Sequence, residues 1–306
     1  MNKPVFAISC PYDTYSGYGA RARDIVKAII NTGKYDVKLM AQRWGSTAWG
    51  FCDDHPEWAY LKGHQLPENK LATKPDIWMQ ITIPNEFQPV GKYNIGCTAG
   101  IESNLCKVEW IEGLNRMDLN FVSSNFAKQT FEGTKYEMKD KKTNQTVKTT
   151  KLEKPIEVIF EGANLDVYKP ITSKEIKSIK LEEIKESFCF LFVGHWMQGA
   201  YGHDRKNVWK TVKAFFETFK NARQKPALIL KASVGVASYA SREDILDRIK
   251  QIRESVNATD LPNVYLLNGE FSDQEVNELY NHPKVKAMVS FTKGEGFGRP
   301  LLEFCL

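Results

Sequence analysis

A glycine-rich segment near the end of the chain carries two glutamates whose spacing suits a polyhydroxylated ligand. It covers residues 294–303 and reads Gly-Glu-Gly-Phe-Gly-Arg-Pro-Leu-Leu-Glu. An apolar stretch at 285–291 precedes it and predicts a strand, and ligands of open α/β sheets bind at the carboxyl ends of the strands. Glu295 can accept hydrogen bonds from sugar hydroxyls, and Glu303, about two turns along the next helix, can bind a diol such as a ribose. A glycine-rich turn with a surface glutamate explains the same residues equally well.

Backbone amides in this segment could bind a phosphate. Gly296, Phe297 and Gly298 allow the main chain to approach an anion closely, and a helix is expected to begin just after them. Pro300 suits the first turn of that helix because its missing N–H would be unpaired there in any case. The residues therefore favour an anion next to the two carboxylates.

Two cations precede another predicted helix in the same half of the chain. Arg205 and Lys206 lie directly before a helix expected at 207–222. Cations oppose the dipole at a helix N-terminus, so this placement favours binding of an anionic ligand over a purely structural role. Lys231, at the end of the next predicted strand, is a weaker candidate for the same site, and a solvated lysine is the simpler explanation for it.

A second glycine-rich loop lies near the start of the chain. Gly17, Gly19 and Ala22 match the Gly-x-Gly-x-x-Ala pattern that binds dinucleotides after a first strand. That pattern also requires an acidic residue after the second strand, and the apolar run at 37–40 is followed by Ala and Gln42 instead. The loop therefore predicts a phosphate-facing turn more strongly than it predicts a dinucleotide site.

The elements that must position these residues form two α/β domains. Short apolar runs alternate with amphipathic stretches in each half, a pattern typical of doubly wound parallel sheets. We predict a first domain at 1–165, a charged connector at 166–187 and a second domain at 188–306. The expected strands are 5–8, 37–40, 77–81, 119–122, 156–160, 188–193, 227–230, 264–267 and 285–291, and the expected helices are 20–32, from 126, 207–222, 243–255 and 273–281. The last helix is cut off at Leu306, which predicts that the second domain is incomplete and that a further segment or chain completes it.

A lysine-rich insertion interrupts the first domain at 139–154. Residues 134–154 hold seven lysines against three acidic residues, a surplus of four positive charges. The insertion predicts an exposed hairpin or mobile loop, and basic patches attract phosphates. A non-catalytic polyanion-binding protein is therefore one alternative function.

Composition places the chain among ordinary soluble proteins. It has 306 residues, 42% of them hydrophobic and 26% charged, with a formal charge of +5. Six scattered cysteines and five histidines predict neither disulfides nor a zinc site. We find no apolar run long enough to span a membrane and no secretory leader, so we expect a cytoplasmic protein. No Asp-x-Asp occurs, and we predict no metal.

The ordered motifs resemble retaining glycosyltransferases of the GT-B fold, particularly family 4. Residues 295–303 are similar to the family's E-x7-E motif, so the resemblance implies that Glu295 contacts the donor sugar and Glu303 the nucleotide ribose. Arg205 and Lys206 resemble the cations that bind the donor diphosphate. His195 stands where the family usually has Arg, and with Lys231 and Arg299 it would lie beside the donor.

The resemblance extends into the first half of the chain. Gly17 and Gly19 resemble the loop that faces the donor phosphates or the acceptor. Glu102, in a segment similar to a motif found in some of these transferases, would face the cleft as a second catalytic residue. It could orient an acceptor hydroxyl or stabilise an oxocarbenium-like transition state. A carboxylate that only supports its neighbours is an equally good explanation.

The implied function is transfer of a sugar from a nucleotide-sugar donor, UDP- or GDP-linked, to an acceptor that could be a glycan, lipid, protein or modified DNA. The resemblance implies retention of configuration without a metal or other cofactor. A Rossmann-type oxidoreductase or epimerase is the second alternative. It would need an acidic ribose ligand and a Tyr/Lys or Cys/His set that the sequence does not reveal.

Overall fold

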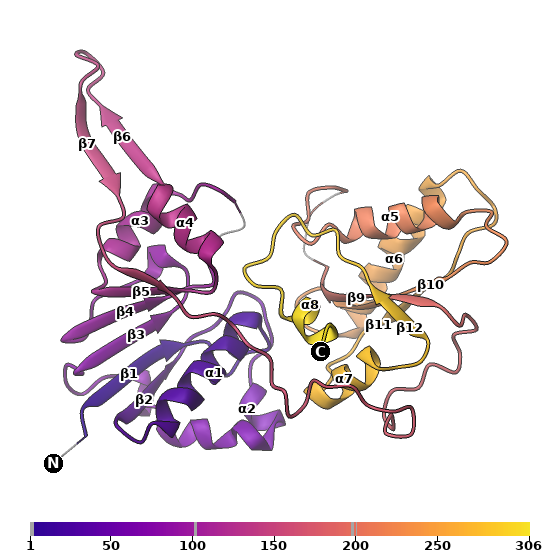
Figure 1. Cartoon of the computed structure of the whole chain (residues 1–306), viewed down its shortest axis with the longest axis horizontal. Coiled ribbons are helices and arrows are strands. Elements are labelled where there is room, and N and C mark those ends of the chain that lie inside the picture. The colour runs from indigo at the N-terminus through magenta and orange to yellow at the C-terminus, as the bar shows by residue number, and fades with distance from the viewer. Residues whose placement is uncertain (1–2, 101–102, 197–198, 200) are drawn as a thin grey trace. The chain divides into compact units, whose positions relative to one another are not determined.

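The chain forms two compact units, residues 1–161 and 162–306. The structure is a computed structural model, and it describes residues 3–100, 103–196, 199 and 201–306 (Figure 1). The first unit therefore ends four residues before the domain limit expected at 165. Residues 166–187, expected as a connector, fall within the second unit.

Six parallel strands form the sheet of the first unit, in the order β2-β1-β3-β4-β5-β8. Alternate residues of β1 point to opposite faces, since Phe6 and Ile8 pack with α1 whereas Ala7 packs with α3 and α4. Figure 1 shows α1 and the α3–α4 pair on these two sides. The strands are β1 (Val5–Cys10), β2 (Asp36–Ala41), β3 (Ile77–Ile81), β4 (Tyr93–Cys97), β5 (Leu119–Val122) and β8 (Ile156–Val158). The helices are α1 (Gly17–Asn31), α2 (Phe51–Asp54), α3 (Val108–Asn115) and α4 (Asn125–Gly133), with 3-10 turns at Pro56–His64, Pro67–Asn69 and Pro84–Glu86.

Two elements of this unit were not predicted. Strand β4 contains Asn94 and Gly96, which have low strand propensity, and Asn94 serves the fold through hydrogen bonds to the Gly91 backbone. Helix α3 contains Gly113, where a Cβ would lie 1.8 Å from the backbone oxygen of Pro84. The turn at Pro84–Glu86 packs so closely on α3 that only glycine fits at position 113, and glycine has a low helix propensity.

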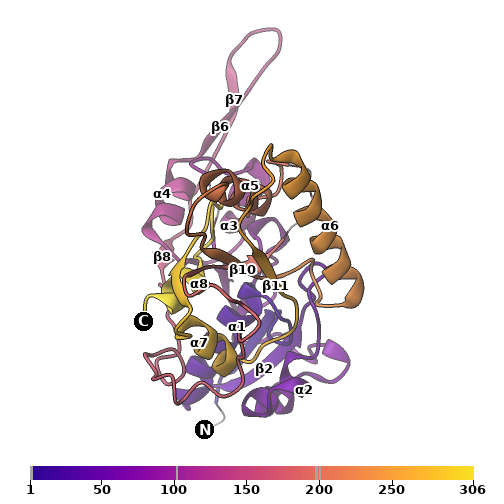
Figure 2. The same cartoon turned by 90° about the vertical axis from the view of Figure 1, so that its right-hand side faces the viewer.

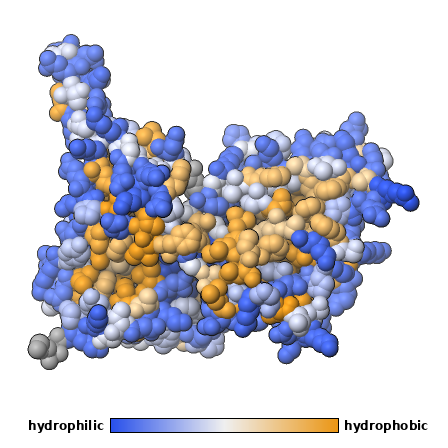
Figure 3. All heavy atoms as spheres, viewed as in Figure 1, coloured by the Kyte–Doolittle hydropathy of each residue, from blue (hydrophilic) through white to orange (hydrophobic). Residues whose placement is uncertain are grey.

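Of the two structures expected for the lysine-rich insertion, a hairpin or a mobile loop, the structure has the hairpin, and its first strand begins at Lys135 rather than at 139. Strand β6 (Lys135–Lys139) pairs antiparallel with β7 (Thr146–Lys151). Its base is fastened where the Tyr136 hydroxyl donates to the Cys106 backbone oxygen at 2.6 Å. The hairpin projects beyond α3 and α4 in Figure 1, and its surface in Figure 3 is mostly hydrophilic. Met138 and Val147 are its exposed large apolar side chains.

Four parallel strands form the sheet of the second unit, in the order β11-β10-β9-β12. Phe192 of β9 packs in the cluster that contains α5 and α6, whereas Leu191 packs in the cluster that contains α7. Figures 1 and 2 show the helices on both faces of this sheet. The elements are β9 (Cys189–His195), α5 (Val208–Phe219), β10 (Ala227–Ser233), α6 (Tyr239–Ser255), β11 (Val264–Leu267), α7 (Asp273–Tyr280), β12 (Val285–Met288) and α8 (Arg299–Phe304).

The segment before β9 is an ordered strap on the second unit. Tyr168, Leu181 and Ile184 are buried in the cluster that contains α7. The carboxylate of Glu278, itself on α7, accepts hydrogen bonds from three successive backbone amides of the strap, residues 177–179, at 2.7–3.2 Å. These contacts explain why the strap belongs to the second unit.

Candidate active site

The centre of the candidate site is an ion-paired cluster in the second unit. The ammonium of Lys206 lies 2.5 and 2.6 Å from the two carboxylate oxygens of Glu295. Arg205 lies 3.4 Å from the same carboxylate and donates to the Gly294 backbone oxygen at 2.6 Å. The side chains of Lys206 and Glu295 are only 16% and 18% exposed. The structure thus brings together three of the residues predicted to bind the donor.

Strand order explains this meeting. Strands β9 and β12 are neighbours, so the loop after β9 and the loop after β12 leave the same edge of the sheet. The two loops are then joined by backbone contacts, because the Lys293 amide donates to the Arg205 oxygen at 3.0 Å and Asn207 donates to the Phe291 oxygen at 3.0 Å. Residues 205–207 and 291–295 therefore form one continuous rim.

The turn into α5 fixes the direction of the two cations. Asn207, expected as the first residue of the helix, is its N-cap in the left-handed region, with φ of 56°. The buried Asp204 carboxylate accepts from the Val208 amide at 2.7 Å and caps the first turn. Arg205 and Lys206 thus precede the helix, as predicted, and the helix begins one residue later than expected.

The glycine-rich segment ends at a backbone conformation that requires glycine. Gly298 has φ of 86° and is the N-cap of α8. Gly296 and Phe297 are partly exposed in the loop before it. Helix α8 begins at Arg299, directly after these residues, as expected.

Glu303 is buried on the inner side of α8. It is 9% exposed, and its carboxylate lies 3.3 Å from the Arg299 guanidinium one turn earlier. Burial, together with the nearby Glu303 charge, raises the pKa of Tyr280 above its usual range. The structure therefore places Arg299 and Glu303 against each other, a pairing that the sequence analysis did not anticipate.

His195 ends β9, whereas Lys231 lies within the neighbouring strand β10, which continues beyond its expected end, to Ser233. The Nδ1 atom of His195 lies 3.1 Å from the Ser233 hydroxyl. Burial, and then the positive charge of Lys206, lower the pKa of His195, so the ring is neutral at neutral pH. Lys231 donates to the Gly269 oxygen at 2.6 Å and lies 4.5 Å from the centre of the Phe271 ring. Lys231 is thus held by the fold, and burial lowers its pKa.

The two predicted glycines of the first unit differ in their surroundings. A Cβ on Gly19 would lie 2.4 Å from the Thr14 backbone oxygen, and the Gly19 amide already donates to the Ser16 hydroxyl. Gly17 is exposed, and a Cβ there would meet nothing within 4 Å. Gly17 is therefore accessible to a ligand, whereas Gly19 serves close packing. Glu102 lies outside the described residues.

An aromatic stack beside Gly17 was not predicted as part of a site. Tyr18 stacks on Trp44 with ring centroids 3.8 Å apart. Its hydroxyl lies 2.9 Å from the Thr98 hydroxyl and accepts from the Ala99 amide at 3.0 Å. The signal in the sequence is Trp44 itself, a large aromatic residue in the loop after the second strand.

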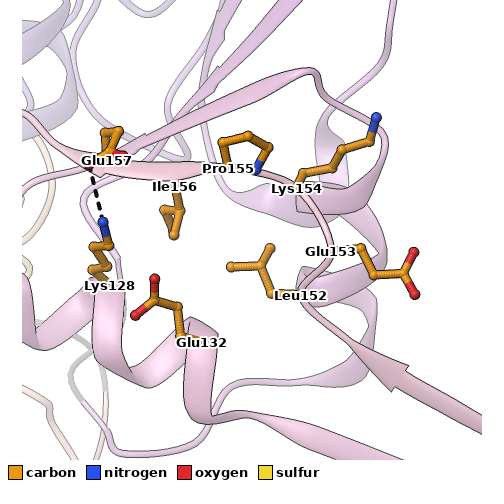
Figure 4. A pocket seen from close by; sticks show the side chains of 8 residues that line it. All are labelled: Lys128, Glu132, Leu152, Glu153, Lys154, Pro155, Ile156 and Glu157. Carbon is orange, nitrogen blue, oxygen red and sulfur yellow. Dashed lines mark hydrogen bonds and ion pairs between the residues drawn. The ribbon is translucent and has the colours of Figure 1, made fainter.

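The first unit also has a surface recess of about 380 Å³ beside α4 and β8 (Figure 4). Charged side chains surround a small apolar floor, and Lys128 pairs with Glu157 at 3.1 Å. The recess contains none of the predicted site residues.

Among the described residues, no group of three or more His, Cys, Asp or Glu side chains could hold a metal ion. The described helices include none that is long and apolar enough to cross a membrane.

Comparison with known proteins gives matches in structure and none in sequence. No protein-family model matches the chain. No curated protein matches it either. A structure described as trehalose-6-phosphate from E. coli, bound with UDP-2-fluoro glucose, matches with a TM-score of 0.54 at 10% identity, over 98% of this chain and 80% of the other. A UDP-forming α,α-trehalose-phosphate synthase from Burkholderia xenovorans matches with a TM-score of 0.56 at 11% identity, over 99% and 81%.

A third match comes from work on glycosyl transfer with retention by trehalose-6-phosphate synthase, with a TM-score of 0.52 at 10% identity, over 98% of this chain and 81% of the other. Identities this low establish the fold alone. Each unit has the parallel α/β sheet that was predicted. The chain therefore has the two-domain α/β fold of these synthases, and the predicted GT-B fold class is confirmed.

Proposed function

We propose that the chain is a nucleotide-sugar-dependent glycosyltransferase whose donor binds at the rim formed by residues 205–207 and 291–295. The observation that carries the proposal is the meeting of Lys206, Arg205 and Glu295 at the carboxyl edge of the second sheet. A nucleotide sugar presents an anionic diphosphate next to neutral hydroxyls. Two cations beside one carboxylate supply partners for both chemical groups.

The proposed reaction breaks the bond between the anomeric carbon and the diphosphate oxygen. The bonding electrons leave with the diphosphate, so negative charge develops there, and Lys206 and Arg205 are placed to stabilise it. The acceptor oxygen forms the new bond to the anomeric carbon. Its hydroxyl proton passes to the departing phosphate oxygen, which balances the charge without a separate base.

Several finer assignments belong to the same proposal. Glu295 would accept hydrogen bonds from the donor sugar, and Glu303 would bind the ribose after exchanging its contact with Arg299. The order of motifs supports a relationship to family 4. The UDP-sugar and the retention named for the matched synthases support a UDP-linked donor and retained configuration. We expect no metal requirement, and a cytoplasmic location stays a prediction.

A thermal-shift screen tests the proposal. UDP-, GDP-, ADP- and dTDP-sugars are added separately to the protein, to Glu295→Ala and to a control, Glu243→Ala, which removes an exposed carboxylate paired with Arg242 on α6. A ligand that binds only the folded state raises the melting temperature. We expect one nucleotide class to stabilise the protein and the control, and the sugar-dependent part of the shift to disappear in Glu295→Ala. Absence of a shift with all four classes would contradict the proposal.

A further inference from the structure

The pairing of Lys206 with Glu295 has a consequence for which ligands the site can hold. We propose that Glu295 makes diphosphate binding conditional on the donor sugar, because both ligand groups compete for contacts that the two side chains now make to each other. The inference rests on the proposed function. It adds a selection rule: the intact nucleotide sugar is preferred over the free nucleoside diphosphate.

The geometry supplies the competition. The Lys206 ammonium is within 2.6 Å of both oxygens of Glu295, so two of its three donors point at one carboxylate. Both side chains are largely buried, at 16% and 18% exposure, where charge interactions are stronger than in water. A diphosphate can use Lys206 only by drawing the ammonium away from that carboxylate.

A free nucleoside diphosphate must break the ion pair between Lys206 and Glu295 without offering the carboxylate any replacement. Once Lys206 turns to the phosphates, the Glu295 carboxylate loses its closest cation in a partly desolvated position. The carboxylate then also lies near the negative charge of the ligand. Arg205 compensates only in part, because it is 3.4 Å from Glu295 and its shorter contact, 2.6 Å, is to the Gly294 oxygen.

A nucleotide sugar carries hydroxyl groups that can replace the hydrogen-bond donors that Glu295 loses when Lys206 turns away. Sugar O–H groups donate to the two carboxylate oxygens and replace the N–H donors of Lys206. The exchange therefore satisfies both side chains when sugar and diphosphate arrive together. After transfer the hydroxyls leave with the acceptor, Lys206 and Glu295 pair again, and the diphosphate product is held less tightly.

The variant Glu295→Gln tests this inference because it keeps the side-chain volume and removes the charge. Isothermal titration with UDP, UDP-glucose, GDP and GDP-mannose measures the affinities of the wild-type protein and the variant. We expect the nucleoside diphosphate of the preferred base to bind the variant about 5–30-fold more tightly, the range set by one or two kcal/mol. The preference for the sugar-linked form over the free diphosphate should fall by at least as much.

Two further variants isolate the cause. Glu243→Gln removes an equivalent charge from an exposed ion pair and should leave all four affinities unchanged. In a Lys206→Gln background, Glu295→Gln should give no gain for the diphosphate, since the competing pair is already absent. Unliganded melting temperatures are measured for every variant, and the comparison uses those that melt as the wild type does.

The outcomes separate the inference from the proposed function. If the diphosphate binds the wild type but Glu295→Gln binds it equally or more weakly, the inference is wrong and the proposed function stands. The same conclusion follows if the gain persists without Lys206. If none of the four ligands binds the wild type or any variant, and no ADP- or dTDP-sugar stabilises the protein in the thermal-shift screen, the proposed function itself fails.

Discussion

The two glycines at the start of α1 should respond oppositely to the same substitution. In Gly19→Ala the new Cβ would lie 2.4 Å from the Thr14 oxygen and 2.9 Å from the Pro11 oxygen, distances that force backbone atoms apart. That loop cannot yield easily, because Arg23 donates to the Tyr12 oxygen at 2.8 Å and to the Thr14 oxygen at 3.0 Å. Gly17→Ala adds the same methyl group into open space.

The magnitudes follow from these surroundings. Overpacking typically costs about 1–3 kcal/mol, and weakening one loop hydrogen bond adds about 1 kcal/mol, so Gly19→Ala should destabilise the first unit by about 2–4 kcal/mol. For Gly17→Ala we expect a change between zero and about 1 kcal/mol of stabilisation, because alanine loses less backbone freedom on entering a helix. Two substitutions two residues apart should thus differ in sign.

Urea unfolding followed by tryptophan fluorescence measures the difference, since five of the seven tryptophans lie in the first unit. Gly17→Ala serves as the matched control for Gly19→Ala. The reasoning is refuted if Gly19→Ala unfolds at the wild-type urea concentration, or if both variants lose stability equally. Ligand titration of Gly17→Ala adds a functional readout, because a methyl at this exposed amide should weaken phosphate binding without loss of stability.

Three further predictions concern other parts of the chain. Because the pKa of His195 is lowered in the folded protein, its contribution to stability is present above its usual pKa of about 6.5 and is lost as pH falls below that value. The variant His195→Asn should therefore show a smaller drop in melting temperature between about pH 8 and about pH 5 than the wild type does. An equal drop in both proteins would contradict the lowered pKa. Glu278→Ala removes the acceptor of three strap amides and should destabilise the second unit by about 2–4 kcal/mol in urea unfolding, whereas Glu182→Ala, an exposed carboxylate of the strap, should change it little. Replacing 137–149 by a two-residue turn should leave the protein folded, as measured by circular dichroism. If the acceptor is polyanionic, sugar transfer to it should become slower and lose its salt dependence, whereas hydrolysis of the donor should be unchanged. Unchanged sugar transfer at all salt concentrations would rule out a role for the hairpin.

The sequence predicted the helices and strands in which local propensity favours the same structure that packing in the folded unit requires. Strand β3 matches its predicted bounds, and the helix expected from residue 126 is α4, which begins at Asn125 where the Ser124 side chain accepts from the Ala127 amide. Strand β4 and helix α3 were missed because Gly96 and Gly113 are present for close approach, and that need exists only in the folded unit. Local propensity cannot reveal a contact with a residue distant in the chain.

The candidate site divides in the same way. Its residue types and their order were predicted, but the pairing of Lys206 with Glu295 depends on β9 and β12 being neighbours, which periodicity does not specify. The pairing also changes how the residues are understood. In the sequence, Lys206 and Glu295 are separate contacts for two parts of a donor. In the structure the Lys206 ammonium and the Glu295 carboxylate bond to each other, so a ligand that binds only one of the two side chains must break their ion pair and leave the other side chain without that partner. On the function proposed above, the site would recognise a combination of groups, diphosphate with sugar, and strand order is the feature that makes the two contacts interdependent.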